Sequence, residues 1–285
     1  MSEKNMENKV IMITGATSGI GEVTARELAR MGALVVGVGR NPEKCGLVEQ
    51  AVRQETGNPE VNFLVADLSS QSEIYRLVGE FKQRFSRLDV LVNNAGAVFF
   101  KRIESVDGLE MTFALNHMSY FLLTGLLLDT LKASAPARIV NVSSGAHVNA
   151  KLDLDDLQFQ KSYNGWKAYS RSKFANILFT YELARRLNGS GVSVNALHPG
   201  FVATGLAKNN SWLVRVGVKI AQTAARSPEE GARTMIYLAS SNDVEGVSGR
   251  YYQDLHPEKS APSTYDVSLA QRLWEISEGL IILKD

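Results

Sequence analysis

The chain has 285 residues, of which 45% are hydrophobic and 21% are charged, and its formal net charge is +1. This composition is that of an ordinary globular protein, and the length fits one large α/β domain or two small ones. The balanced charge excludes a global electrostatic field that would attract nucleic acid or an anionic membrane. The single cysteine, Cys45, excludes an internal disulfide and a cysteine-based zinc site, and it fits a reducing cytosol.

Two stretches bear on location. Residues 1–9 are polar and lack the apolar run of a signal peptide. The most apolar long stretch, 113–131, contains Asn116, His117 and Asp129, which predicts a buried helix rather than a membrane span. We therefore expect a cytoplasmic protein with no integral membrane segment and no nucleic-acid partner.

Short apolar runs alternate with helical patterns along the chain. In chain order, the patterns predict a strand at 10–13, a helix at 20–31, a strand at 34–38, a helix at 42–56, a strand at 61–65, a helix at 72–85, a strand at 88–92, a helix at 109–131, a strand at 138–142, a helix at 168–187, a strand at 192–197, a helix from 228, a strand at 249–252 and a helix at 269–283. Such alternation implies right-handed crossovers and a parallel sheet covered on both faces. We therefore predict a single α/β domain, residues 1–285, with a doubly wound parallel sheet of about seven strands. Ligands of such sheets bind beyond the carboxyl ends of the strands.

The first strand-to-helix turn, residues 14–21, is rich in glycine. Gly15 permits a tight turn, Gly19 allows close approach of the backbone, and Gly21 lets the helix pack on the sheet. Backbone amides at such a helix N-terminus bind a pyrophosphate. Three residues, not one, separate the first two glycines, so the spacing departs from the usual dinucleotide fingerprint. We favour nucleotide binding over a plain glycine-rich turn.

Arg40 follows the second predicted strand, at the place where an acidic residue would select NAD. A guanidinium fits a 2′-phosphate by charge and by paired hydrogen bonds. The sequence therefore favours NADP(H), with NAD(H) as the alternative if Arg40 only stacks on adenine or faces solvent.

Tyr169 and Lys173 are four residues apart in a predicted helix and so share one face. An ammonium beside a phenol favours the phenolate, which lowers a pKa that starts near ~10 and lets the tyrosine exchange a proton near neutral pH. An isolated pair of this kind also occurs on solvated helix faces. The serine pair Ser143-Ser144 follows the fifth predicted strand, where a hydroxyl could donate to a substrate carbonyl.

These features, with the segment 93–96 and Pro199-Gly200, occur in the order and approximate spacing of the short-chain dehydrogenases/reductases, which the chain resembles over residues 8–255. The resemblance implies a Rossmann-type fold. It also implies a catalytic set in which Tyr169 is the general acid/base, Lys173 lowers its pKa and holds the nicotinamide ribose, Ser144 orients the carbonyl, and Asn116 contributes to a proton relay. The cofactor-binding residues expected in this way are Gly15, Thr17, Ser18, Gly19, Ile20, Gly21, Arg40, Asn41, Asp67, Leu68, Asn94, Ala95, Gly96, Tyr169, Lys173, Pro199, Gly200, Val202 and Thr204.

A narrower resemblance rests on residues 138–144, on the insertion at 152–157 and on the segment 176–180, which look like the retinol dehydrogenase branch. The implied activity is NADP(H)-dependent interconversion of a carbonyl and an alcohol on an apolar substrate. Two alternatives stay open. One is a catalytically silent NADP(H)-binding sensor or scaffold, and the other is a carbon–carbon double-bond reductase of the same fold.

Expectations for the substrate pocket and for partners are coarser. His147, Phe201 and Trp212 are candidate substrate contacts, and residues 201–227 are expected to form a lid, the rival interpretation being a helix packed on the core or on a membrane surface. A helical tail is expected at 265–285. By resemblance, the helices at 109–131 and 168–187 form a subunit interface, which predicts a homodimer or homotetramer. The four histidines show no ligand pair, so no metal is expected.

Overall fold

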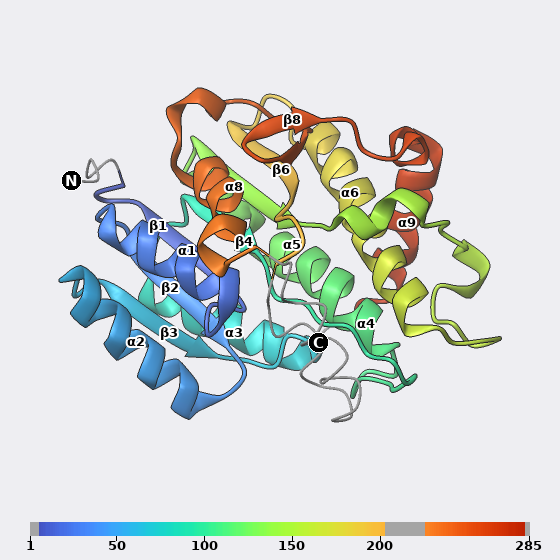
Figure 1. Cartoon of the computed structure of the whole chain (residues 1–285), viewed down its shortest axis with the longest axis horizontal. Helices are drawn as coiled ribbons and strands as arrows, with labels where there is room; N and C mark the ends of the chain where they lie inside the picture. The colour runs from blue at the N-terminus through green and yellow to red at the C-terminus, as the bar shows by residue number, and fades with distance from the viewer. Residues whose placement is uncertain (1–5, 203–225, 283–285) are drawn as a thin grey trace.

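Eight strands form one sheet in the order β3-β2-β1-β4-β5-β6-β7-β8 in this computed structural model, which describes residues 6–202 and 226–282 (Figure 1). The first seven strands run parallel, and β8 is antiparallel to β7. The order reverses between β1 and β4, which is the point where ligands of doubly wound sheets bind. The strands are β1 (Val10–Thr14), β2 (Leu34–Gly39), β3 (Val61–Val65), β4 (Val90–Asn93), β5 (Ala137–Val142), β6 (Val192–His198), β7 (Tyr251–Gln253) and β8 (His256–Glu258).

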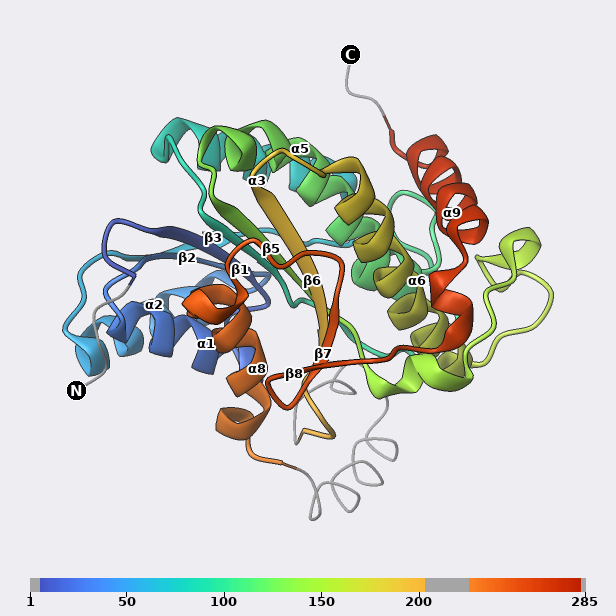
Figure 2. The same cartoon turned by 90° about the horizontal axis from the view of Figure 1, so that it is seen from above.

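Helices cover both faces of the sheet, as predicted (Figure 2). One face carries α1 (Gly19–Arg30), α2 (Pro42–Thr56) and α8 (Pro228–Ser240), and the other carries α3 (Gln71–Arg84), α5 (Ser119–Ala133) and α6 (Gly165–Arg186). Successive residues of a strand point to opposite faces. In β1, Ile11 and Ile13 therefore pack in the core under α1 and α8, whereas Met12 packs in the core under α3 and α5. The central strands are apolar on both sides for this reason.

The most apolar stretch of the chain divides into α4 (Met111–Phe113), a π-helical turn η1 (Ala114–Met118) and α5. Residues 111–133 are long and apolar enough to cross a membrane, but 72% of the most apolar window is buried inside the fold. The remaining described residues contain no second helix of that kind. This burial favours the predicted core helix.

Two features at the C-terminal end differ from the sequence-based expectation. The exposed edge strand β8 was not predicted, because its three residues include Pro257 and form no apolar run. The last helix, α9 (Val267–Gly279), begins two residues early, where the Asp266 side chain accepts a hydrogen bond from Leu269 N at 3.0 Å, and it ends at Gly279 rather than at residue 283.

Helix α9 lies alongside α6 and also reaches α5 (Figure 2). The ring of Trp274 lies 4.8 Å from that of Phe121 on α5 and 5.7 Å from that of Phe179 on α6. The helices predicted to form a subunit interface are thus partly covered by the chain's own C-terminal helix. The predicted lid at 201–227 falls almost entirely outside the described residues.

Candidate active site

A cleft of about 650 Å³ opens at the carboxyl ends of the central strands, where the strand order reverses. It extends from the glycine-rich turn after β1 to the Pro199-Gly200 turn after β6. The structure brings most of the predicted site residues to its walls, namely Gly15, Thr17, Ser18, Gly19, Ile20, Arg40, Asp67, Leu68, Asn94, Ala95, Gly96, Ser144, Tyr169, Lys173, Pro199, Gly200, Phe201 and Val202.

The glycine-rich turn has the geometry that an anion-binding loop needs. Gly15 and Gly19 have φ values of +67° and +58°, which L side chains rarely adopt. A Cβ on Gly21 would lie 2.4 Å from Gly15 O, so only glycine permits this approach of α1 to the turn. Ser18 precedes α1 without capping it through its side chain, which leaves the first helix amides facing the cleft.

Asn94 supports the glycine-rich turn from the neighbouring strand end. Its Nδ2 donates to Thr14 O at 2.8 Å, and its backbone N–H donates to Thr14 Oγ1 at 2.8 Å. Two adjacent strand ends are thereby fixed to each other at the switch point of the sheet. The turn after β4, which was predicted to bind the cofactor, thus supports the glycine-rich turn at the cleft wall.

At the end of β2, Arg40 is exposed and lines the cleft, and no carboxylate of the described residues lies within ion-pair distance of it. Asn41 was predicted to bind the cofactor but does not line the cleft. Its side chain instead accepts a hydrogen bond from Lys44 N at 2.8 Å and caps α2. The sequence analysis missed this role, which Pro42 at the first helical position signals.

Tyr169, Lys173 and Ser144 meet at the floor of the cleft. Tyr169 is hydrogen-bonded to the Ser144 side chain, and Lys173 Nζ lies 5.9 Å from the centre of the Tyr169 ring. Lys173 Nζ donates to Val142 O at 3.0 Å. The neighbouring Ser143 donates to the backbone carbonyl of Lys173 at 2.7 Å, so Ser144, not Ser143, is the serine that reaches the tyrosine.

Burial dominates the electrostatics of this group. It raises the pKa of the Tyr169 phenol, which the hydrogen bond from Ser144 partly offsets, and it lowers the pKa of Lys173 to about 7. The helical spacing of the two residues predicted that the lysine would lower the tyrosine pKa. The direction is opposite here because Nζ points to a carbonyl of β5 and because both groups are buried.

Asn116 lies under the cleft on the π-helical turn and does not itself line the wall. Its side chain donates to Ala97 O at 2.9 Å and accepts from Ala97 N at 2.9 Å, which fixes the turn after β4. A Cβ on Gly96 would lie 3.2 Å from Asn116 Oδ1 and 3.3 Å from Lys173 Nζ. Asn116 therefore holds the cleft wall against the lysine, consistent with a supporting position.

The apolar part of the cleft was only partly predicted. Phe201 is exposed at the wall, and Phe100 and Trp166 also line it. Trp166 was missed, although it lies three residues before Tyr169 on the same helix face, and its ring is stacked on the tyrosine at 5.5 Å. Thr204 and Trp212 lie outside the described residues.

The prediction that His147 contacts substrate is wrong. The ring is 1% exposed and absent from the cleft wall. Its Nδ1 lies 2.7 Å from Ser144 O, and its Nε2 accepts from Ala261 N at 3.1 Å. Both ring nitrogens therefore bind backbone, and the side chain ties the segment after β5 to the C-terminal region.

The cleft fits a dinucleotide. It offers free helix amides beside two positive-φ glycines, an exposed guanidinium at the end of β2 and a buried lysine at the far end. These groups match a pyrophosphate, the adenosine ribose and a nicotinamide ribose in that order. Among residues 6–202 and 226–282, no group of three or more metal-binding side chains is present.

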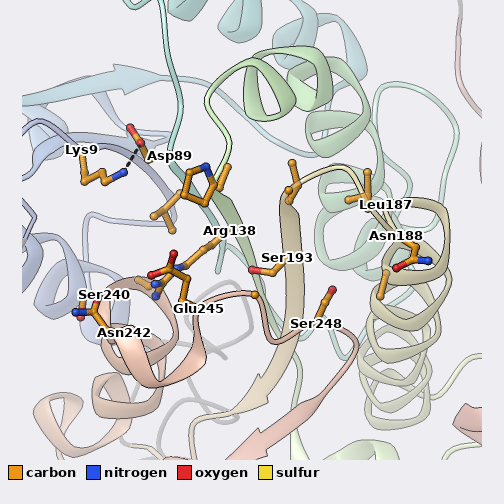
Figure 3. Close-up of a pocket in the computed structure, with 18 of the residues that line it drawn as sticks. Lys9, Asp89, Arg138, Leu187, Asn188, Ser193, Ser240, Asn242, Glu245 and Ser248 are labelled. Carbon is orange, nitrogen blue, oxygen red and sulfur yellow. Dashed lines mark hydrogen bonds and ion pairs between the residues drawn. The ribbon is translucent and has the colours of Figure 1, made fainter.

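A second hollow, of about 340 Å³, lies at the opposite edge of the sheet, where β4, β5 and β6 begin (Figure 3). Three of the charged side chains that line it have partners. Lys9 Nζ donates to Asp89 at 3.0 Å, and Arg138 Nη1 donates to Ser241 O at 2.8 Å. None of the predicted site residues lies there.

Comparisons with known proteins agree with this arrangement, which is that of a nucleotide-dependent oxidoreductase. The model of the short chain dehydrogenase family matches residues 9–212. The chain belongs to the short-chain dehydrogenase family, within its retinol dehydrogenase-like branch. It is an oxidoreductase that acts on CH–OH groups.

One relative is human retinol dehydrogenase 14, which is 45% identical over 97% of this chain and 87% of its own length. Among solved structures, an uncharacterised protein from Mycobacterium paratuberculosis superposes with a TM-score of 0.79 at 34% identity, over 96% of this chain and 93% of that one. The RhlG/NADP active-site complex from Pseudomonas aeruginosa gives a TM-score of 0.70 at 28% identity, over 88% of this chain and 96% of that one.

Proposed function

We propose that this protein is an NADP(H)-dependent oxidoreductase that interconverts a carbonyl and an alcohol on an apolar substrate, with Tyr169 as the general acid/base. One observation carries the proposal. The half-buried Ser144 and the buried Tyr169 and Lys173 lie in the same cleft as the glycine-rich turn. A silent binding protein would need the turn but not the acid/base group.

The residues divide the chemistry as follows. NADPH, when bound, supplies the hydride. The Ser144 hydroxyl holds the substrate oxygen, and the Tyr169 phenol gives its proton to the alkoxide that develops there. Lys173 then restores the proton to the tyrosine, since a pKa of about 7 lets its amino group carry or release a proton near neutral pH.

The direction of the tyrosine shift favours reduction near neutral pH. A phenol whose pKa is raised stays protonated there and is ready to donate. Oxidation of an alcohol needs the phenolate, so we expect it to require a more alkaline solution. The proposal therefore predicts that reduction has its optimum at lower pH than oxidation.

The choice of NADP(H) and of an apolar substrate is supported by residues of the cleft and by similar proteins. Arg40 is the group that would bind a 2′-phosphate, and the structurally similar RhlG was solved as an NADP complex. Trp166, Phe100 and Phe201 give the cleft an apolar side, and one relative is named a retinol dehydrogenase. Long apolar carbonyls are thus the substrates to try first.

The test is a panel assay. The purified protein is mixed with NADPH or NADH and with aldehydes and ketones that range from short aliphatic chains to polyenes, and cofactor absorbance is followed. We expect consumption of NADPH with long apolar carbonyls. Tight NADPH binding without turnover on any compound would favour a catalytically silent sensor or scaffold. A product reduced at a carbon–carbon double bond would favour the double-bond reductase.

Assembly and location remain predictions. We expect a homodimer or homotetramer whose subunits contact each other through α5 and α6. Helix α9 already packs on both of these helices, so it would be part of the same interface. Light scattering after gel filtration measures the assembly. We also expect the cytoplasmic fraction to contain the protein, which cell fractionation would test.

A further inference from the structure

A buried chain of polar side chains connects the C-terminal helix to the floor of the cleft. Ser277 of α9 lies 3.0 Å from His117 Nε2, and His117 Nδ1 lies 3.3 Å from Asn176 Oδ1 on α6. None of the three side chains has exposed surface. Polar groups buried in this way are retained only when each has a partner, so their alignment constrains all three elements.

Asn176, at the cleft end of this series of hydrogen-bonded side chains, fixes the directions of the hydrogen bonds. Asn176 Nδ2 donates to the backbone carbonyl of Asn116 at 2.9 Å, so the amide oxygen is the atom that faces the histidine. His117 therefore carries its proton on Nδ1 and presents the lone pair of Nε2 to the Ser277 hydroxyl, whose one proton is shared between Nε2 at 3.0 Å and Leu273 O at 2.8 Å. Loss of the serine hydroxyl would leave that ring nitrogen without a donor in an apolar surrounding.

The inner end of the chain lies beside Lys173. Asn176 Nδ2 also lies 3.5 Å from Val142 O, the carbonyl to which Lys173 Nζ donates at 3.0 Å. His117 and Asn116 both belong to the π-helical turn, and such turns often occur at functional sites. The π-helical turn is thus bonded to both α6 and α9, next to the Val142 carbonyl that Lys173 binds.

We infer that Ser277, His117 and Asn176 are positioning residues for Lys173, so that the C-terminal helix is part of the active-site support. Asn176 keeps the Asn116 carbonyl and the Val142 carbonyl in place, His117 keeps Asn176 in its orientation, and Ser277 anchors His117 from α9. The inference rests on the proposed function for its catalytic consequence, but the geometry that it predicts is independent of turnover.

Two substitutions test the chain. Ser277→Ala removes only the outer hydroxyl. His117→Phe removes both ring hydrogen bonds but keeps an aromatic ring between Phe113 and Phe179, with which the histidine already packs. Each should lower kcat by about 10-fold to 100-fold, the effect of a small misplacement at a reacting group, while the NADPH dissociation constant and substrate KM stay close to wild type.

The control is Trp274→Phe, which weakens the packing of α9 on α5 and α6 but leaves Ser277, His117 and Asn176 in place. It should lower the melting temperature but leave kcat unchanged. Wild-type kcat in both test variants, or an equal loss of kcat in the control, would overturn the inference.

A crystal structure of the Ser277→Ala variant tests the orientation of Asn176 independently of enzymatic activity. The Asn176 amide should turn away from the Asn116 carbonyl. An unchanged Asn176 would overturn the inference, whether or not the wild-type protein reduces any compound of the panel. Absence of wild-type turnover with a displaced Asn176 would contradict the proposed function and leave the positioning chain supported.

Discussion

Tyr169 and Lys173 owe their chemistry to burial more than to each other. The pKa of the tyrosine is raised and that of the lysine falls to about 7, because each side chain is buried in its uncharged form more readily than in its charged form. Ser144 moderates the tyrosine shift by a hydrogen bond. The result is a phenol that keeps its proton, beside a lysine whose pKa is about 7.

In the proposed function, the choice between NADPH and NADH depends on Arg40, which is exposed and lines the cleft. Exchange for aspartate in Arg40→Asp should weaken NADPH binding by about 10-fold to 100-fold, because it removes charge-assisted hydrogen bonds to the 2′-phosphate. NADH binding should be maintained or improved. Titration of protein fluorescence measures both dissociation constants.

The matched control for this charge reversal is Lys44→Asp, at an exposed position of α2 that does not line the cleft. It should leave the ratio of the two dissociation constants as in wild type. A wild-type ratio in Arg40→Asp would show that the arginine does not read the phosphate.

His117 makes the free energy of unfolding depend on pH. Its pKa falls from 6.5 to about 4 because it is buried, so between these values the unfolded chain binds a proton that the folded chain does not. Stability from this residue is present above pH 6.5 and is lost as the pH falls, by roughly 3 kcal/mol at pH 4. Urea unfolding at a series of pH values measures the loss.

His117→Phe should flatten the unfolding free energy over this pH range, whereas His256→Gln, at an exposed histidine, should not. The same pH dependence in His117→Phe as in wild type would contradict the assignment.

Local motifs predicted most of the residues that the structure brings to the cleft, and other contacts explain why two predicted residues do not reach it. The positions of Tyr169, Ser144 and the glycines were predictable because each lies at a strand end or on one helix face. His147 was misassigned because its partner Ala261 lies 114 residues away, a contact that no local pattern signals. Asn41 was misassigned because capping and ligand binding use the same side-chain oxygen.

At the scale of elements, α9 and the turn after it behave as a clamp on the rest of the fold. Gln71, buried at the start of α3, donates from Nε2 to Leu280 O at 2.9 Å and accepts from Ile282 N at 2.8 Å. One amide side chain thus satisfies two backbone groups just beyond α9. The predicted tail at 265–285 therefore docks within its own chain over the described part.

Gln71→Ala should destabilise the protein by about 1–3 kcal/mol, because it leaves two backbone groups without their partner. This corresponds to a fall of several degrees in melting temperature, which scanning fluorimetry records. Gln50→Ala, at an exposed position of α2, is the control and should change little. Equal melting temperatures for both variants would mean that the clamp contributes nothing.

Elements with a strong apolar period were predicted to within a few residues, and those made by tertiary contact were not. The strands β1, β2 and β3 carry continuous apolar runs and match the prediction closely. The π-helical turn η1 interrupts a helix that the sequence pattern showed as continuous. Its irregularity is supported by bonds from α6 and α9 that lie far along the chain.

On the scale of the whole molecule, the sheet has a different hollow at each edge. Its carboxyl edge carries the cleft with Tyr169, and its opposite edge carries a smaller hollow in which Lys9 is paired with Asp89 (Figure 3). Parallel strands bring turns that are distant in sequence to one edge, which is why residues from 15 to 202 line a single cleft. The fold class was predictable from the alternation of patterns alone.

The most direct test of the account is the rate of reduction by Tyr169→Phe on the carbonyl that the wild-type protein reduces fastest. Phenylalanine keeps the ring that stacks on Trp166 and removes only the hydroxyl. We expect kcat to fall by ~10²–10⁴-fold while the NADPH dissociation constant is unchanged. An undiminished kcat would contradict the assignment of Tyr169 as the proton donor.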